Sequence, residues 1–283
     1  MSRPSTSLQR TYRYLRLAIA GSVVVVFAGV AVSLPRVGLL PSISHYYYSP
    51  GNTVFVGALI AVAVCFFALS GRGAERVLLD VAAVILPLVA IVPTVISPGS
   101  VPGIDSTCAR GARTCVPESF DAAVDTGILT YLVVALVAVA VAVALLLSGE
   151  VERSGTLLSL AISVAILLVV GLFWWLARDV FLRWAHLGAA VAFFSVIAAV
   201  ALINAIAPAA DDAPRWLRRV YIAIAVALAA VVLGLPLYGE AHVGSVYGVL
   251  VGEVVALALF AAFWILQSVQ YWRADDPSIM TRD

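Results

Sequence analysis

Eight long apolar runs alternate with short polar connections along the chain of 283 residues. A helix needs about 20 mostly apolar residues to cross about 30 Å of hydrocarbon. The runs are continuous, whereas the strands of a membrane barrel alternate between apolar and polar positions. The pattern therefore predicts an all-α, polytopic transmembrane helix bundle of about eight spans, at residues 15–34, 53–70, 77–96, 128–147, 156–176, 186–206, 217–236 and 246–269.

The positions of the arginine residues predict the orientation of these spans. All 17 basic residues are arginine. With the N-terminus in the cytoplasm, twelve of them fall on the inner side and five on the outer side, as the positive-inside rule requires. We therefore predict that both termini are cytoplasmic, with an N-terminal segment at 1–14, an eight-span domain at 15–272 and a tail at 273–283.

The longest connection, at residues 97–127, is predicted to lie outside. It is rich in Pro, Gly and Ser, which argues against regular structure. Cys108 and Cys115 stand seven positions apart within it. An outer compartment is oxidising, so a disulfide-closed loop is the favoured interpretation, against two free thiols or a metal-binding pair.

Composition supports the membrane assignment and excludes other classes. The chain is 63% hydrophobic and 12% charged, whereas soluble domains average about 45–50% and about 25%. Its net charge of +1 comes without a basic stripe, so we expect no nucleic-acid partner. The absence of lysine excludes a lysine Schiff base, as in retinal proteins, and lysine-based covalent catalysis.

The first outer connection holds an unusual group of polar side chains in "SISHYYYSPGN", residues 42–52. Tyrosine favours the membrane interface, so His45, Tyr46 and Tyr47 can simply belong to an aromatic belt. The alternative is an outward-facing polar pocket, because Asn52, His186 and Glu253 map to the same side. We therefore take as candidate ligand-binding residues His45, Tyr46, Tyr47, Asn52, His186 and Glu253.

Histidine also raises the question of a metal or catalytic site. The three histidines of the chain, His45, His186 and His242, all fall at outer helix ends or loops. They are weak metal candidates, because neither a His-x-x-x-His nor a His-Glu-x-x-His pattern occurs. We expect no metal and no cofactor.

Charged residues inside the predicted spans are costly in hydrocarbon and therefore informative. Glu253 lies in the last span, beside the small-residue stripe Gly244, Gly248 and Gly252, which lets another helix approach closely. Its carboxyl group is either a hydrogen-bonded packing group or a group that binds a ligand or a proton. Asp80, near the inner side, is predicted to pair with an arginine such as Arg72 or Arg76.

Several segments together resemble a family of bacterial multi-span membrane proteins of unknown function. They are "SISHYYY" and "VFVGAL" (Ser42 to Leu59), "VPT" (Val92 to Thr94), His186 followed by "AAVAFF", and a last span with Glu253 that ends in "FW". The resemblance implies a multi-pass protein of the bacterial inner (plasma) membrane. It implies no activity.

From these observations we expect a protein that binds or transports a lipid or small amphiphile through the outward-facing pocket. One alternative is an outer-leaflet hydrolase or transferase that uses the His and Glu residues. Another is a non-catalytic subunit of a membrane complex, whose glycine stripe packs against a partner or a second copy. Membrane lipids are the expected partners in each case.

Overall fold

The computed structural model describes residues 6–69, 73–108, 112–151, 153–206, 214–241 and 247–272, with side chains of the 214–241 range described up to residue 234. These residues form eight α-helices and two short 3₁₀ helices. The elements in chain order are α1 (Ser7–Val37), η1 (Ser44–Tyr48), α2 (Asn52–Ala68), α3 (Gly73–Ile91), η3 (Glu118–Phe120), α4 (Asp121–Leu147), α5 (Arg153–Leu176), α6 (Arg178–Ile206), α7 (Arg215–Ala241) and α8 (Gly248–Gln270).

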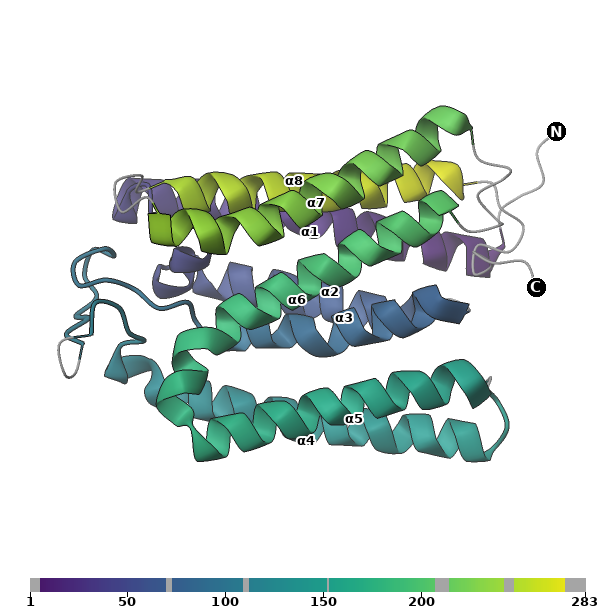
Figure 1. Cartoon of the computed structure of the whole chain (residues 1–283), viewed down its shortest axis with the longest axis horizontal. Coiled ribbons are helices and arrows are strands. Elements are labelled where there is room, and N and C mark those ends of the chain that lie inside the picture. The colour runs from purple at the N-terminus through teal and green to yellow at the C-terminus, as the bar shows by residue number, and fades with distance from the viewer. Residues whose placement is uncertain are drawn as a thin grey trace.

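Helix α3 lies at the centre of the bundle, and most of its side chains are buried (Figure 1). Helices α2, α5 and α6 pack against it, while α1, α7 and α8 form a layer on one side of this core. Helix α4 lies on the other side, against α5 and part of α3. We call the end that carries η1 and residues 97–117 the disulfide end, and the end where α1 begins and α8 ends the opposite end.

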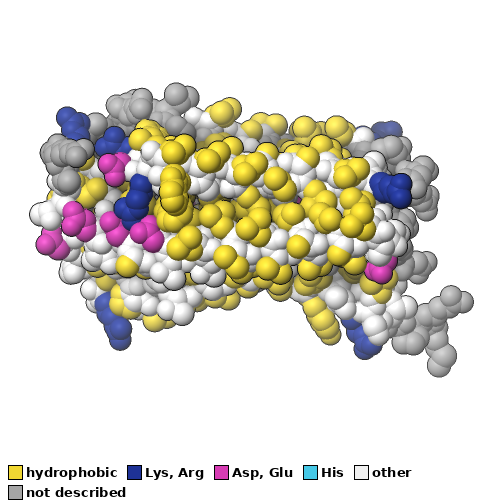
Figure 2. Space-filling model, turned by 90° about the horizontal axis from the view of Figure 1, so that it is seen from below, with side chains coloured by type: hydrophobic (Ala, Val, Ile, Leu, Met, Phe, Trp, Pro, Cys, Tyr) yellow, Lys and Arg dark blue, Asp and Glu magenta, His cyan; other side chains and the backbone are white. Residues whose placement is uncertain are grey.

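Six helices of the described chain are long and apolar enough to cross a membrane. They include α1, α4, α5, α6, the first 20 residues of α7 (Arg215–Gly234) and α8. The face formed by α4 and α5 has a broad hydrophobic band with charged side chains at its two ends (Figure 2). A large exposed apolar band is not stable in water. The fold is therefore an all-helical bundle of the multi-pass membrane type.

Helices α2 and α3 were predicted to be spans but are not among these six helices. Helix α2 is apolar but has only 17 residues. Helix α3 contains Glu75, Arg76 and Asp80 in its first half. Asp80 accepts a hydrogen bond from Ser159 Oγ at 2.7 Å and lies 3.9 Å from Arg76 Nε, which confirms the predicted ion pair.

Two helix ends lie several residues away from the predicted boundaries. The predicted span 77–96 stops early, because α3 ends at Ile91. Pro93 has no backbone N–H, and it disfavours helical geometry in the preceding residue. The last residues of the predicted loop 97–127 are helical, since η3 begins at Glu118 and α4 at Asp121. The last residues of the predicted loop read "DAAVDTG". Asp121 is favourable in the first turn of α4, because a negative charge is stabilised at the N-terminus of a helix.

The end of α3 leaves the Val92 carbonyl without a hydrogen bond from within the helix. In a continued helix, the Val92 carbonyl would accept a hydrogen bond from the N–H of Ile96. Ile96 instead pairs with Cys115 in an antiparallel bridge, with N···O distances of 2.9 and 3.1 Å. The Val92 carbonyl is consequently available to a side chain from another helix.

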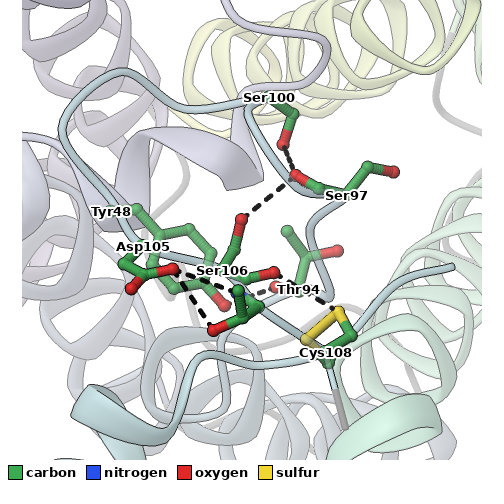
Figure 3. Close-up of a disulfide and its surroundings, with 9 residues drawn as sticks. Tyr48, Thr94, Ser97, Ser100, Asp105, Ser106 and Cys108 are labelled. Carbon is green, nitrogen blue, oxygen red and sulfur yellow. Dashed lines mark hydrogen bonds between the residues drawn. A yellow bond between two sulfur atoms is a disulfide. The ribbon is translucent and has the colours of Figure 1, made fainter. Parts of the chain in front are cut away.

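The predicted disulfide is confirmed. Cys108 and Cys115 are joined at an S–S distance of 2.07 Å, next to the Ile96–Cys115 bridge. The surrounding loop folds back on η1, where the hydroxyl of Tyr48 donates to the Thr94 carbonyl at 2.6 Å (Figure 3). This arrangement holds the loop and η1 together over the ends of the helices.

Candidate functional site

A cavity of about 600 Å³ extends from the disulfide end into the bundle. Ligand pockets for small molecules usually enclose about 300–1,000 Å³. Most of the cavity wall is apolar, with contributions from α1, α2, α3, α6, α7 and α8. The apolar lining includes Val23, Val26, Phe55, Leu59, Val62, Leu86, Val89, Phe193, Phe194, Ala256, Leu257 and Phe260. The exposed side chains of Arg183 and Trp184 also line it, so the cavity reaches the surface of the described chain.

The polar groups of this cavity gather where the start of η1 meets α6 and α8. Glu253 of α8 accepts hydrogen bonds from the backbone N–H groups of Ile43, at 2.5 Å, and Ser44, at 3.4 Å. Ser44 Oγ lies 2.7 Å from Glu253 Oε1 and 3.0 Å from His186 Nε2 of α6. The hydroxyl of Ser44 thus joins the imidazole ring to the carboxyl group, and we call Ser44, His186 and Glu253 the serine cluster.

The other nitrogen of His186 settles the orientation of its ring. His186 Nδ1 is 2.7 Å from the Val92 carbonyl oxygen, which can only accept a hydrogen bond. Nδ1 therefore carries a proton, and Nε2 is the nitrogen that faces Ser44. His186 and Ser44 are only 6% and 8% exposed as whole residues, so both are held away from bulk water.

Proton counting shows what this arrangement requires. Three hydrogen bonds connect Val92, His186, Ser44 and Glu253, and each needs one proton. A neutral imidazole, a hydroxyl and a carboxylate supply only two. The serine cluster must therefore hold a third proton, either on the Glu253 carboxyl group or on the imidazole. Its net charge is then zero, which suits a site with little access to water.

His45 completes the polar wall of the cavity from the side of η1. Its backbone N–H donates to Ser42 Oγ at 3.1 Å, and the Ser42 hydroxyl lies 2.5 Å from His45 Nδ1. Burial lowers the pKa of His45 from 6.5 to about 4, and the nearby imidazole of His186 contributes a smaller part of this decrease. His45 is consequently neutral at physiological pH and can accept or donate a hydrogen bond there.

Three other predicted ligand-binding residues do not line the cavity. The hydroxyl of Tyr46 donates to the Gly38 carbonyl at 3.1 Å, and that of Tyr47 to the Ile91 carbonyl at 3.4 Å. The side-chain amide of Asn52 donates to the Tyr47 carbonyl at 2.6 Å. The aromatic-belt interpretation is also wrong, because Tyr46, Tyr47 and Tyr48 are buried. These side chains shape the η1 segment instead of facing lipid or ligand.

The metal candidates are only partly placed. His45 and His186 both line the cavity, whereas His242 lies outside the described residues. Across the described ranges, no group of three or more His, Cys, Asp and Glu side chains could hold a metal ion. Of the glycine stripe, Gly248 and Gly252 lie in the first turns of α8, and Gly244 is not described.

A second buried polar cluster lies at the opposite end, and the sequence analysis missed it. Asn204 Nδ2 donates to Glu75 Oε1 at 3.2 Å, and Gln267 Nε2 donates to Asn204 Oδ1 at 2.7 Å. The guanidinium of Arg16 faces the ring of Tyr271 at 5.2 Å and is attracted by the charge of Glu75. We call Arg16, Glu75, Asn204 and Gln267 the opposite cluster.

The positions of the charged residues in the sequence do not predict this buried cluster. Arg16 and Glu75 stand at the ends of apolar runs, where charged side chains normally face water and headgroups. Both are only 1% exposed, because four helices converge there. The available signals were Asn204 and Gln267, two amides inside the apolar runs 186–206 and 246–269.

No protein-family model, no curated protein and no solved structure matches this chain. The resemblance to the bacterial multi-span family therefore stays a prediction.

Proposed function

We propose that the protein binds a lipid or small amphiphile in the cavity, with the polar part of the ligand beside the serine cluster and its apolar part among the helices. This proposal rests on the separation of apolar and polar side chains in the cavity wall. Its depth is lined by Val, Leu and Phe side chains, while Ser44, His45, His186 and Glu253 gather at one part of it. Such a wall is complementary to a molecule with one polar and one apolar portion.

The proposed setting is a membrane that all eight helices cross, with both termini in the cytoplasm. The disulfide end then faces the exterior, where an oxidising compartment keeps the Cys108–Cys115 bond intact. Under this topology the cavity draws its ligand from the outer leaflet or the exterior. The plasma membrane of a bacterium is the proposed location.

Photo-crosslinking tests the binding proposal directly. The purified protein in lipid nanodiscs is exposed to a lysophospholipid that carries a diazirine in its acyl chain, and the crosslinked peptides are mapped. Labelling is expected within residues 183–194 and 249–260, which contribute cavity-lining side chains. Labelling confined to the exposed faces of α4 and α5 would contradict the proposal, because any lipid reaches those faces.

A pair of matched variants makes this test specific. Ala190 and Ala199 are both half-buried on α6, but only Ala190 lines the cavity. Ala190→Phe should reduce labelling of the cavity peptides about tenfold, since the added ring occupies the space that the acyl chain needs. Ala199→Phe should leave the labelling at the parental level.

A further inference from the structure

The Ser44 hydroxyl differs from that of Ser22, which lines the same cavity. Ser22 Oγ donates to the Ile19 carbonyl at 2.7 Å, which is an ordinary helical contact with a group that cannot take up the proton. Ser44 Oγ lies between His186 Nε2 and Glu253 Oε1, and whichever of the two does not hold the third proton is a base. In both proton arrangements described above, the Ser44 proton is directed at that base.

This geometry is the one that activates a hydroxyl group. A serine becomes a nucleophile when an adjacent base accepts its proton and a third group orients that base. His186 Nε2 is 3.0 Å from Ser44 Oγ, and the Val92 carbonyl fixes the ring through Nδ1. The third proton of the serine cluster is a source of acid for a leaving group.

The surroundings of Ser44 also favour negative charge. The N–H groups of Ile43 and Ser44 both point at Glu253 Oε2. Two converging backbone N–H groups beside a nucleophile are the donors that stabilise the oxyanion formed during acyl transfer. The Glu253 carboxyl group now occupies that place, and a substrate carbonyl oxygen would have to take it over.

We propose that Ser44 is the nucleophile of an acyl-transfer reaction on an ester-bearing amphiphile bound in the cavity. This inference rests on the proposed function and names the class of its ligand. With the third proton on Glu253, Ser44 Oγ forms a bond to the ester carbonyl carbon and its own proton passes to His186 Nε2. The ester C–O bond then breaks, the proton moves to the departing alcohol, and an acyl-serine remains. A water molecule or an acceptor alcohol attacks this ester in the reverse sense and frees Ser44.

The experiment uses a long-chain alkyl fluorophosphonate on the intact protein in nanodiscs. An activated serine attacks phosphorus and fluoride departs, so a stable mass increment marks the modified residue. Peptide mapping of the parent protein should find the increment on Ser44 and none on Ser22. The two serines share one cavity, so the comparison needs no variant that risks misfolding.

Substitutions then test the role of the base. His186→Gln should slow the modification of Ser44 by about 10²-fold or more, because general-base assistance contributes about 10²–10⁴-fold. Ser148→Ala, at the end of α4 and outside the cavity wall, should leave the rate unchanged. An unmodified Ser44 in protein whose cavity is crosslinked by the diazirine lipid would overturn the nucleophile while leaving amphiphile binding intact. A parental rate in His186→Gln would overturn the role of His186 as the base, and a cavity that neither crosslinks nor reacts would overturn both proposals.

Discussion

The two buried polar clusters resemble each other in composition and differ in what surrounds them. Each joins side chains from separate helices through hydrogen bonds, and each contains a glutamate. The serine cluster lines a cavity of about 600 Å³, whereas none of the opposite cluster's four residues lines it. The serine cluster also uses backbone N–H groups of a short 3₁₀ segment, while the opposite cluster links side chains of long helices. Burial of polar groups is therefore common to both clusters, and only the serine cluster lies next to the cavity.

The largest expected effect is loss of stability when a charge of the opposite cluster is removed. Glu75→Ala leaves the guanidinium of Arg16 buried without its neighbouring carboxyl group. Removal of one partner from a buried pair costs about 3–5 kcal/mol. Thermal unfolding in detergent should show this loss, whereas amphiphile crosslinking of the protein that remains folded should be unchanged. A parental melting temperature would show that the cluster does not hold the helices together.

The serine cluster should separate stability from binding. Glu253→Ala leaves the N–H groups of Ile43 and Ser44 without an acceptor, at a cost of about 1–3 kcal/mol. Glu253→Gln keeps an oxygen for these donors and should unfold close to the parental temperature. Because it changes the charge and the hydrogen-bonding pattern beside the ligand, we expect Glu253→Gln to alter crosslinking by the lysophospholipid. Parental crosslinking in both variants would show that the carboxyl group is only structural.

The loss of folding stability at acid pH should depend in part on His45. The pKa of His45 is about 4 in the folded protein, below the ordinary value of 6.5. Between these values the unfolded chain binds more protons at this position than the folded chain does, so stability falls as the pH drops from 6.5 towards 4. His45→Asn should show a smaller decrease of melting temperature over this window. An identical decrease in parent and variant would assign the acid sensitivity to other groups.

The smallest expected effect concerns an ion-pair network at the disulfide end, away from the serine cluster. Arg178 contacts Asp121 at 3.3 Å and Asp125 at 3.0 Å, and all three side chains are about one-third exposed. Partly exposed pairs contribute about 1 kcal/mol or less. Arg178→Ala should therefore lower the free energy of unfolding only slightly. This decrease should be smaller at high salt, because salt screens exposed charges. A loss comparable to that of Glu75→Ala would contradict this ranking.

The sequence predicts the helices well because apolar runs of this length leave few other structures possible in lipid. The disulfide follows from spacing and compartment. The break of α3 at Pro93 is visible in the sequence, but its consequence is not: only the packing of α6 on α3 brings His186 to the Val92 carbonyl. Ser44 has no signal of its own, because its role depends on helices that meet it from 142 and 209 residues further along the chain. The burial of Tyr46, Tyr47 and Tyr48 could not be predicted for the same reason, since it depends on the loop that folds over η1.

The most direct test of the account compares both clusters in a single measurement. Hydrogen–deuterium exchange is followed by mass spectrometry in nanodiscs, with and without a saturating lysophospholipid. Protection should increase at the amides of residues 42–48 and remain unchanged in the peptides that contain Asn204 and Gln267. Equal changes at the two ends, or no change at residues 42–48, would contradict the claim that the ligand binds beside the serine cluster.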